Sequence, residues 1–305
     1  MPLDAECAAF VQAVHDAGVR WDDDTDPVEA TVAWGAAIML GTGGPEPVDR
    51  VADLDADGVP VRVFSPDAAG ALPLVLSFHG GGFAIGSIES HDPLARRIAN
   101  ATPAVVVSVG YRHGPRDRFP SAHDDAWTAL RWCSKHAEAL GADAARIALV
   151  GDSAGGGLAA YLAVRARDEG EPRLRLQMLW LPLVDHRYDQ ASCAEFAEGF
   201  VLTLEALEWF RSCYLDDPDI DDWRASPARR TDLEGVAPAF VATAECDPLR
   251  DQGEEYARTL RDAGVPVEAH RYDGAYHPFY GMTEMLEVAR RLDADAIDAL
   301  RKALV

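Results

Sequence analysis

Short apolar runs of strand length recur along this chain, separated by longer segments with helical spacing of apolar residues. The strand-like runs cover residues 61–64, 74–78, 104–109, 147–150, 176–183 and 239–244, and residues 265–272 alternate apolar and polar positions. Continuous apolar runs are typical of strands that helices cover on both faces. The pattern therefore predicts an α/β fold with a mostly parallel, doubly wound sheet of about eight strands flanked by helices.

Two segments depart from this alternation. Residues 1–46 favour two helices, near residues 5–17 and 27–40, and residues 186–223 favour one helix over residues 203–210. Neither segment contains a strand-like run. Both are expected to lie outside the sheet.

A serine between glycines follows one of the apolar runs. Residues 147–150 lead into Gly151, Ser153 and Gly155, which have the spacing G-x-S-x-G and precede a helix-like segment. In a nucleophile elbow a strand turns sharply into a helix, and small neighbours leave the serine hydroxyl exposed. Ser153 is therefore the candidate nucleophile. The alternative is that Ser153 caps the following helix.

A glycine-rich loop follows an earlier run. Residues 74–78 are followed directly by His79 and by three glycines that include Gly81 and Gly82. Because glycines in series cost backbone entropy, they suggest a loop whose amides approach a ligand closely. In acyl-transfer enzymes that ligand is the oxyanion. We expect Gly81, Gly82 and Ala154 to donate amide N–H groups to it, although a flexible turn would also account for the glycines.

A serine nucleophile needs a histidine base and a carboxylate that orients the base. Asp247 follows the run at residues 239–244, and His277 lies in a loop expected after residue 272. Carboxyl ends of parallel strands converge at one edge of a sheet, so these residues can meet Ser153. Glu245 and Asp251 are the rival acids. His270 is the rival base, although its place inside a strand favours a structural role.

These motifs resemble those of the bacterial hormone-sensitive lipase-like (family IV) carboxylesterases of the α/β-hydrolase superfamily. The likeness runs from about Val51 to Met282 and rests on His79-Gly80-Gly81-Gly82-Phe83, Gly151-Asp152-Ser153-Ala154-Gly155-Gly156, Asp247-Pro248-Leu249-Arg250-Asp251 and His277. It implies a catalytic triad of Ser153, Asp247 and His277, an oxyanion hole, and no metal or organic cofactor. It also implies a helical cap made of residues 1–46 and 186–223 over a core of residues 47–185 and 224–305.

The resemblance implies hydrolysis of small-molecule esters with short to medium acyl chains. Cap residues would then determine specificity, because a cap excludes water and selects what enters. The candidate pocket residues are Phe83, Trp34, Phe200, Leu202, Trp209 and Phe210. Such residues can also pack helices together. The alternative functions are a specialised amide, lactone or acyl-transfer enzyme with the same triad, and a non-catalytic ligand-binding receptor.

Several positions depart from the family pattern. The segment that in the family carries two acidic residues contains Gly110, His113, Gly114 and Arg116 here, and Pro278 follows His277 where glycine is usual. Proline fixes φ and removes an N–H beside the base. We expect the charge network behind the site to be rebuilt, and the pocket to change shape without loss of the triad.

Composition and net charge limit the kinds of partner that we expect this chain to bind. The 305 residues include 51 acidic and 28 basic residues, for a formal net charge of −23. This charge would repel nucleic acids and anionic membranes. No apolar run approaches the length of a membrane span. The five scattered cysteines form no metal or disulfide spacing, so we expect thiols. Because the N-terminus also lacks a signal-peptide pattern, we expect a cytoplasmic location. The resemblance implies a homodimer as one option.

Overall fold

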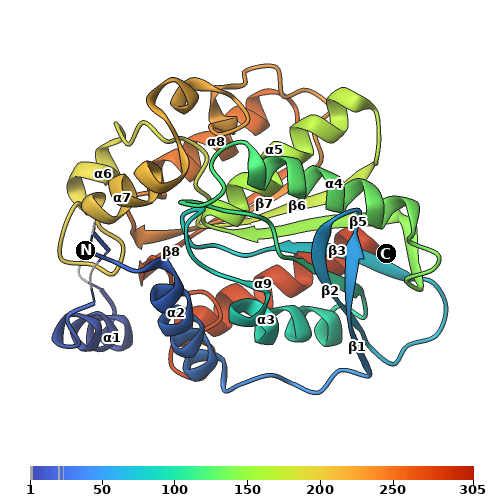
Figure 1. Ribbon diagram of the computed structural model, residues 1–305, viewed down its shortest axis with the longest axis horizontal. Helices are drawn as coiled ribbons and strands as arrows, with labels where there is room; N and C mark the ends of the chain where they lie inside the picture. The colour runs from blue at the N-terminus through green and yellow to red at the C-terminus, as the bar shows by residue number, and fades with distance from the viewer. Residues whose placement is uncertain (1–2, 20, 23) are drawn as a thin grey trace.

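The computed structural model describes residues 3–305 apart from residues 20 and 23, so Asp23 of the acidic run at residues 21–26 lies outside the described residues (Figure 1). Its centre is an eight-stranded sheet with the order β1-β2-β4-β3-β5-β6-β7-β8. The strands are β1 (Arg50–Ala56), β2 (Val59–Ser65), β3 (Leu72–Phe78), β4 (Val105–Val109), β5 (Ala142–Asp152), β6 (Leu174–Trp180), β7 (Ala239–Cys246) and β8 (Val267–Tyr276).

The sheet is mostly parallel. Strands β1 and β2 pair antiparallel, as do β2 and β4, and the remaining neighbours pair in parallel. Strands β3 and β4 are buried along their whole length because helices cover both faces. Side chains alternate between the two faces, so Leu74 and Leu76 belong to one core and Val75 to the other. The predicted fold class is therefore confirmed.

The helices form a layer on each face of the sheet. In Figure 1, α4, α5 and α8 lie above the sheet and α3 and α9 lie below it. The helices are α1 (Ala5–Asp16), α2 (Pro27–Thr42), α3 (Ile88–Ala101), α4 (Ser121–Lys135), α5 (Ala154–Glu169), α6 (Ala191–Glu195), α7 (Leu204–Tyr214), α8 (Arg250–Asp262) and α9 (Glu287–Leu304), with 3-10 turns η1 (Asp217–Asp221) and η2 (Pro227–Arg229).

Helices from both ends of the predicted cap gather at one end of the sheet. In Figure 1, α1 and α2 (blue) lie on the same side of the molecule as α6 and α7 (yellow). Rings join the two segments: the Trp21 ring centroid lies 5.7 Å from that of Phe210. The domain boundaries at residues 46, 185 and 223 stay a prediction.

Several strands differ from the sequence expectations, and three of them show why. Strand β1 had no apolar signal because it is an exposed edge strand held by pairing with β2. Strand β6 ends at Trp180, since Leu181 turns away with φ 48°. Strand β8 continues past residue 272 because the ladder shifts register and resumes with Tyr276 opposite Cys246, so the histidine loop starts later than expected.

Candidate active site

Ser153 occupies a strained turn between β5 and α5. Its backbone has φ 51° and ψ −117°, a conformation that side-chain-bearing residues avoid unless the surroundings impose it. The Ser153 N–H donates to the Trp180 carbonyl at 2.8 Å, and the Ser153 carbonyl accepts from the Leu183 N–H at 2.9 Å. These contacts with the chain after β6 hold the turn in place.

The flanking glycines are required by close packing. A Cβ added at Gly151 would lie 2.1 Å from the Gly155 carbonyl oxygen, and a Cβ at Gly155 would lie 2.0 Å from the carbonyl oxygen of Phe78. Both contacts are with backbone, which cannot move aside. The G-x-S-x-G spacing therefore has a steric cause in this fold.

Ser153, His277 and Asp247 form one chain of hydrogen bonds. His277 Nε2 lies 3.1 Å from Ser153 Oγ, and His277 Nδ1 lies 2.9 Å from Asp247 Oδ2. Asp247 is fully buried, and its Oδ1 accepts the Leu249 N–H at 2.8 Å. Because the carboxylate accepts a hydrogen bond from Nδ1–H, the lone pair of Nε2 is directed at the serine hydroxyl. This arrangement suits proton removal from Ser153.

The rival residues are engaged elsewhere. Glu245 Oε2 accepts the Gly274 N–H at 2.7 Å, and Asp251 Oδ2 accepts the Ser192 N–H at 2.8 Å. His270 pairs with Glu268 at 3.0 Å on the outer part of β8. None of these contacts reaches His277 or Ser153.

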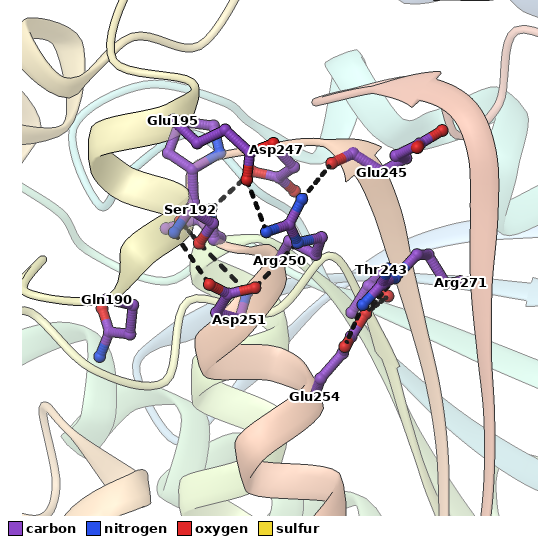
Figure 2. A network of polar contacts seen from close by, with 12 residues as sticks. Gln190, Ser192, Glu195, Thr243, Glu245, Asp247, Arg250, Asp251, Glu254 and Arg271 are labelled. Atoms are coloured by element: carbon purple, nitrogen blue, oxygen red, sulfur yellow. Dashed lines mark hydrogen bonds and ion pairs between the residues drawn. The ribbon is translucent and has the colours of Figure 1, made fainter. Parts of the chain in front are cut away.

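An arginine ties the acid loop to the helical segment above it. Figure 2 shows Arg250 among Asp251, Glu195 and Glu245. Its guanidinium bonds to Asp251 Oδ1 at 2.8 Å, to Glu195 Oε2 at 2.9 Å and to the Glu245 carbonyl at 3.1 Å. Ser192 Oγ adds a bond to the Pro248 carbonyl at 2.7 Å. Helix α6 is thereby fastened to the loop that carries Asp247.

The glycine loop faces the serine with unoccupied amides. Gly81 has φ 120° and Gly82 has φ 59°, values that glycine adopts without strain. Among the described residues, no protein acceptor takes the backbone N–H of Gly81, Gly82 or Ala154. Both glycines line the same pocket as Ser153. The N–H groups of Gly81 and Gly82 are thus left for an oxygen in that pocket, and Ala154 directly follows Ser153.

A buried polar cluster supports the elbow and the glycine loop. A Cβ at Gly80 would lie 2.0 Å from Asp152 Oδ2, so the loop packs directly on this carboxylate. His91 Nε2 lies 3.4 Å from Asp152 Oδ1. Burial and then the charge of Asp152 raise the pKa of Tyr280 and of Tyr111, so both phenols stay neutral. Sequence reasoning missed the two tyrosines and His91, because only the fold brings them to Asp152.

The same loop is secured by Tyr111. Its hydroxyl donates to the His79 carbonyl at 2.6 Å, and its ring centroid lies 4.2 Å from that of His79. Burial and then the neighbouring His91 hold the pKa of His79 well below its usual range. His79 is therefore a neutral structural ring beneath the loop.

A pocket lies above Ser153 and is lined mainly by apolar residues. The lining consists of Trp21, Trp34, Gly81, Gly82, Ile85, Ser153, Leu183, Val201, Leu202, Leu207, Phe210, His277, Pro278 and Tyr280. Of the expected pocket residues, Trp34, Leu202 and Phe210 are among these. Trp21, Ile85, Leu183 and Tyr280 carried no sequence signal, because only tertiary packing places them here.

Three expected pocket residues lie elsewhere. Phe83 turns away from the pocket and stacks on Tyr214, with ring centroids 4.6 Å apart. Trp209 packs on Trp21 at 6.5 Å, and Phe200 packs on Phe196 at 5.4 Å. These rings join helices and loops to one another instead of forming the pocket wall.

The family departures are accommodated in different ways. Arg116 points into solvent and pairs with Asp117, so no reversed charge enters the site. A Cβ at Gly114 would lie 2.2 Å from the Cys213 carbonyl oxygen, so this segment packs tightly on the end of α7. His113 Nδ1 lies 3.0 Å from the Gly114 carbonyl.

The remaining departures also have defined places. The Gly110 N–H donates to the Pro60 carbonyl at 2.9 Å. Pro278 lines the pocket beside His277, as a change in pocket shape would require. The expected rebuilding of the charge network behind the site stays a prediction.

Comparison with known proteins places the chain in a family. Residues 75–281 match the alpha/beta hydrolase fold. The chain belongs to this family. Esterase LipI from Mycobacterium tuberculosis is 40% identical over 265 residues, which cover 84% of this chain and 82% of that protein. Ethyl acetate hydrolase from Pseudomonas putida is 38% identical over the full length of both chains.

Comparison with solved structures also supports the assignment to this alpha/beta hydrolase family. A hyperthermophilic esterase from the archaeon Pyrobaculum calidifontis superposes with a TM-score of 0.93 at 37% identity and 99% coverage of both chains. The resemblance to the hormone-sensitive lipase-like esterases is confirmed. The chain is a carboxylic ester hydrolase that acts on small-molecule substrates. Among the described residues, no helix combines the length and apolarity needed to cross a membrane.

Proposed function

We propose that this hydrolase cleaves carboxylic esters with short to medium acyl chains through an acyl-enzyme on Ser153. The observation that carries the proposal is the hydrogen-bonded chain Ser153–His277–Asp247, whose serine and histidine line an apolar pocket. Polar donors inside an apolar pocket are typical of sites that bind small apolar molecules in one orientation. An ester has that chemistry.

In the first half-reaction His277 Nε2 takes the Ser153 proton while Oγ attacks the ester carbonyl carbon. Asp247 holds the ring and stabilises the imidazolium that forms. The carbonyl oxygen becomes negative and accepts hydrogen bonds from the amide N–H groups of Gly81, Gly82 and Ala154; the first two residues line the pocket. His277 then gives its proton to the departing alkoxide, and the alcohol leaves.

In the second half-reaction His277 removes a proton from water, and the resulting hydroxide attacks the acyl carbon. The oxyanion returns to the same three amides. Ser153 regains its proton from His277 as the acyl–oxygen bond breaks, and a carboxylic acid is released. The complete reaction consumes one ester and one water and releases one alcohol and one carboxylic acid.

The pocket supports a limit on acyl length. Trp34 and Phe210 bring large rings toward Ser153, together with Leu202 and Leu207. These side chains leave little space beside Ser153 for a long acyl chain. Chains beyond medium length would have to displace cap side chains, and for this reason we place the optimum below palmitate.

A series of p-nitrophenyl esters from acetate to palmitate tests the proposal, with Ser153→Ala as the reference. We expect the highest kcat/KM at short to medium chains and a loss of at least about four orders of magnitude in Ser153→Ala. Substantial activity in that variant would remove Ser153 from the mechanism. Hydrolysis of amides or lactones but of no ester would favour the specialised enzyme instead.

We also propose an oligomeric state and a cellular location for this protein. Strand β8 is an edge strand, which supports a homodimer through strand pairing. All five cysteines are buried thiols, and this supports a reducing, cytoplasmic setting. Light scattering would test the homodimer, and cell fractionation would test the cytoplasmic location.

A further inference from the structure

Helix α7 packs on two consecutive residues of the glycine loop. Phe210 lies against Gly82, where an added Cβ would be 2.2 Å from Phe210 Cγ. Tyr214 stacks on Phe83, with ring centroids 4.6 Å apart and an angle of 15° between the ring planes. Residues four apart lie on one side of a helix, so a single side of α7 makes both contacts. A helix of the predicted cap thus rests directly on the loop that carries two of the proposed oxyanion donors.

Phe83 has a backbone conformation that needs support. Its φ is 60°, which places a residue with a bulky side chain in the left-handed region that favours glycine. The Phe83 carbonyl accepts the Gly114 N–H at 2.8 Å, and the side chain is 1% exposed. This hydrogen bond and the packing of the ring tie Phe83 to the rest of the chain. Because the two residues share a peptide unit, a shift of Phe83 also moves Gly82.

The ring of Tyr214 is fixed at its far end. The hydroxyl accepts the Ala122 N–H at 3.2 Å and lies 3.0 Å from His123 Nδ1. Ala122 is in the first turn of α4, where backbone N–H groups have no partner within the helix. Burial raises the pKa of Tyr214 above its usual range, so the phenol stays neutral. A phenylalanine at this position would fill the same space but lose both anchors.

The backbone at the end of α7 is fixed as well. The Phe119 N–H donates to the Tyr214 carbonyl at 3.0 Å. An added Cβ at Gly114 would lie 3.3 Å from Tyr214 Cα. The guanidinium of Arg118 donates to three carbonyls at this helix end, those of Ser212, Cys213 and Leu215. Residues 114–119 therefore contact both the glycine loop and the end of α7.

We propose that Tyr214 is a positioning residue for this reaction. By packing on Phe83, it holds the N–H groups of Gly81 and Gly82 where an oxyanion needs them. The proposal rests on the ester hydrolysis and the oxyanion role proposed above. Oxyanion donors are effective because they are in place before the negative charge forms. Tyr214 is not among the residues that line the pocket, so its loss should slow the chemical step and leave substrate binding almost unchanged.

The first test compares a variant that removes the ring with one that keeps it. Tyr214→Leu removes the stack on Phe83, and Tyr214→Phe loses only the hydroxyl. For hydrolysis of a short p-nitrophenyl ester, we expect kcat to fall about a hundredfold in Tyr214→Leu and about threefold to tenfold in Tyr214→Phe. The KM of both variants should stay within about twofold of that of the unaltered chain.

Tyr256→Leu is the control for the loss of a buried ring. Tyr256 is buried on α8, which contributes no residue to the pocket lining, and the change removes the same atoms. Urea unfolding should show a loss of stability in both leucine variants, but kcat in Tyr256→Leu should stay within about twofold of the unaltered value. Titration to completion with a p-nitrophenyl phosphonate ester counts the competent sites, so that kcat refers to folded enzyme alone.

A trifluoromethyl ketone reports on the oxyanion donors without turnover. The Ser153 oxygen adds to its carbonyl carbon, the hydroxyl proton goes to His277, and the carbonyl oxygen becomes negative. We expect the dissociation constant of this adduct, measured by fluorine NMR, to rise about a hundredfold in Tyr214→Leu. The value in Tyr256→Leu should match that of the unaltered chain.

A double-variant cycle tests the path through Phe83. Because Tyr214 acts through Phe83 in this proposal, Phe83→Leu combined with Tyr214→Leu should lose no more kcat than the more damaging single change. Losses of kcat that multiply would show that Tyr214 does not act through Phe83.

The outcomes separate this proposal from the proposed function. Equal kcat values in Tyr214→Leu and Tyr256→Leu, or a defect of Tyr214→Leu confined to KM, would overturn the positioning role. An unaltered chain that cleaves no ester would refute the proposed function instead. In that case the dissociation constants of the trifluoromethyl ketone still decide whether Tyr214 positions the donors.

Discussion

At the scale of single residues, the site depends on backbone positions that accept no larger side chain. Gly82 shows this most clearly, because its φ is 59° and an added Cβ would lie 2.2 Å from Phe210 Cγ. The ring of Phe210 thus rests on the loop that carries two of the proposed oxyanion donors. A small shift of Gly82 moves those donors.

We expect Gly82→Ala to lower kcat by about a hundredfold to a thousandfold, as for the loss of one oxyanion donor. Gly58→Ala is the control, because Gly58 has φ 93° but no atom within 4 Å of an added Cβ. It carries the backbone strain without the contact. Equal losses of kcat in the two variants would show that strain, and not the contact with Phe210, is responsible.

Two buried histidines set a limit on acid stability. Burial first, and then neighbouring charges, lower the pKa of His123 and of His186 from 6.5 to about 3. The unfolded chain binds protons at these rings near pH 6.5 and the folded chain does not, so stability falls as pH drops from about 6.5 toward 3. Above pH 6.5 the two rings have no effect of this kind.

His123→Phe should therefore flatten the pH dependence of the unfolding free energy. Between pH 7 and pH 4 the loss of stability should shrink by roughly 3 kcal/mol. Urea titrations across this range measure the effect, with the exposed His15→Gln as the control. A slope as steep as that of the unaltered chain would contradict a buried neutral His123.

At the scale of elements, helix α7 contributes side chains to the pocket above Ser153. One side of α7 carries Leu207 and Phe210 into the pocket, and its amino end is capped by Thr203, whose side chain accepts the Ala206 N–H at 3.1 Å. Helix α2 approaches the same pocket with Trp34. The proposed acyl space thus lies between elements that are far apart in sequence.

Leu207→Ala should enlarge this space and move the acyl-chain optimum by about two carbons toward longer esters, since it removes three carbon atoms from the wall. The control is Leu204→Ala, on the same helix and outside the pocket lining. The measurement is kcat/KM along the p-nitrophenyl ester series. An unchanged optimum in Leu207→Ala would place the acyl chain elsewhere in the pocket.

At the scale of the whole molecule, charge dominates. With 51 acidic and 28 basic residues, the folded chain repels itself, and compactness brings these charges closer together. Lysine occurs only at Lys135 and Lys302, so nearly all the compensation comes from arginine. The acidic surface fits either adaptation to salt or the codon usage of a GC-rich genome.

Raising KCl from 10 mM to 500 mM should raise the Tm by several degrees, because the Debye length falls from about 30 Å to about 4 Å and screens this repulsion. A salt-adapted protein would continue to gain activity into the molar range. An activity optimum near zero salt would exclude that adaptation. A Tm that falls on adding salt would mean that ion pairs outweigh the repulsion.

Sequence alone determined the fold class, and it predicted the residues to which we assign the chemistry. The G-x-S-x-G elbow, the glycine loop and the order of Asp247 and His277 are local patterns, because each depends on the backbone geometry of a few neighbouring residues. Apolar runs likewise predicted most of the sheet, since strands buried on both faces leave a continuous signal. Strand β1 was not predicted from the sequence, because its residues are mostly exposed and only its pairing with β2 makes it a strand.

Tertiary structure alone decided the pocket wall, the support around Asp152 and the contact between α7 and the glycine loop. Trp21, Tyr280 and Leu183 reach the pocket from separate elements, whereas Phe83 and Trp209 turn away to pack against other rings. Side-chain direction depends on which neighbours fill the space around a residue, and those neighbours come from distant parts of the chain. A local sequence pattern therefore cannot predict which way such a side chain points.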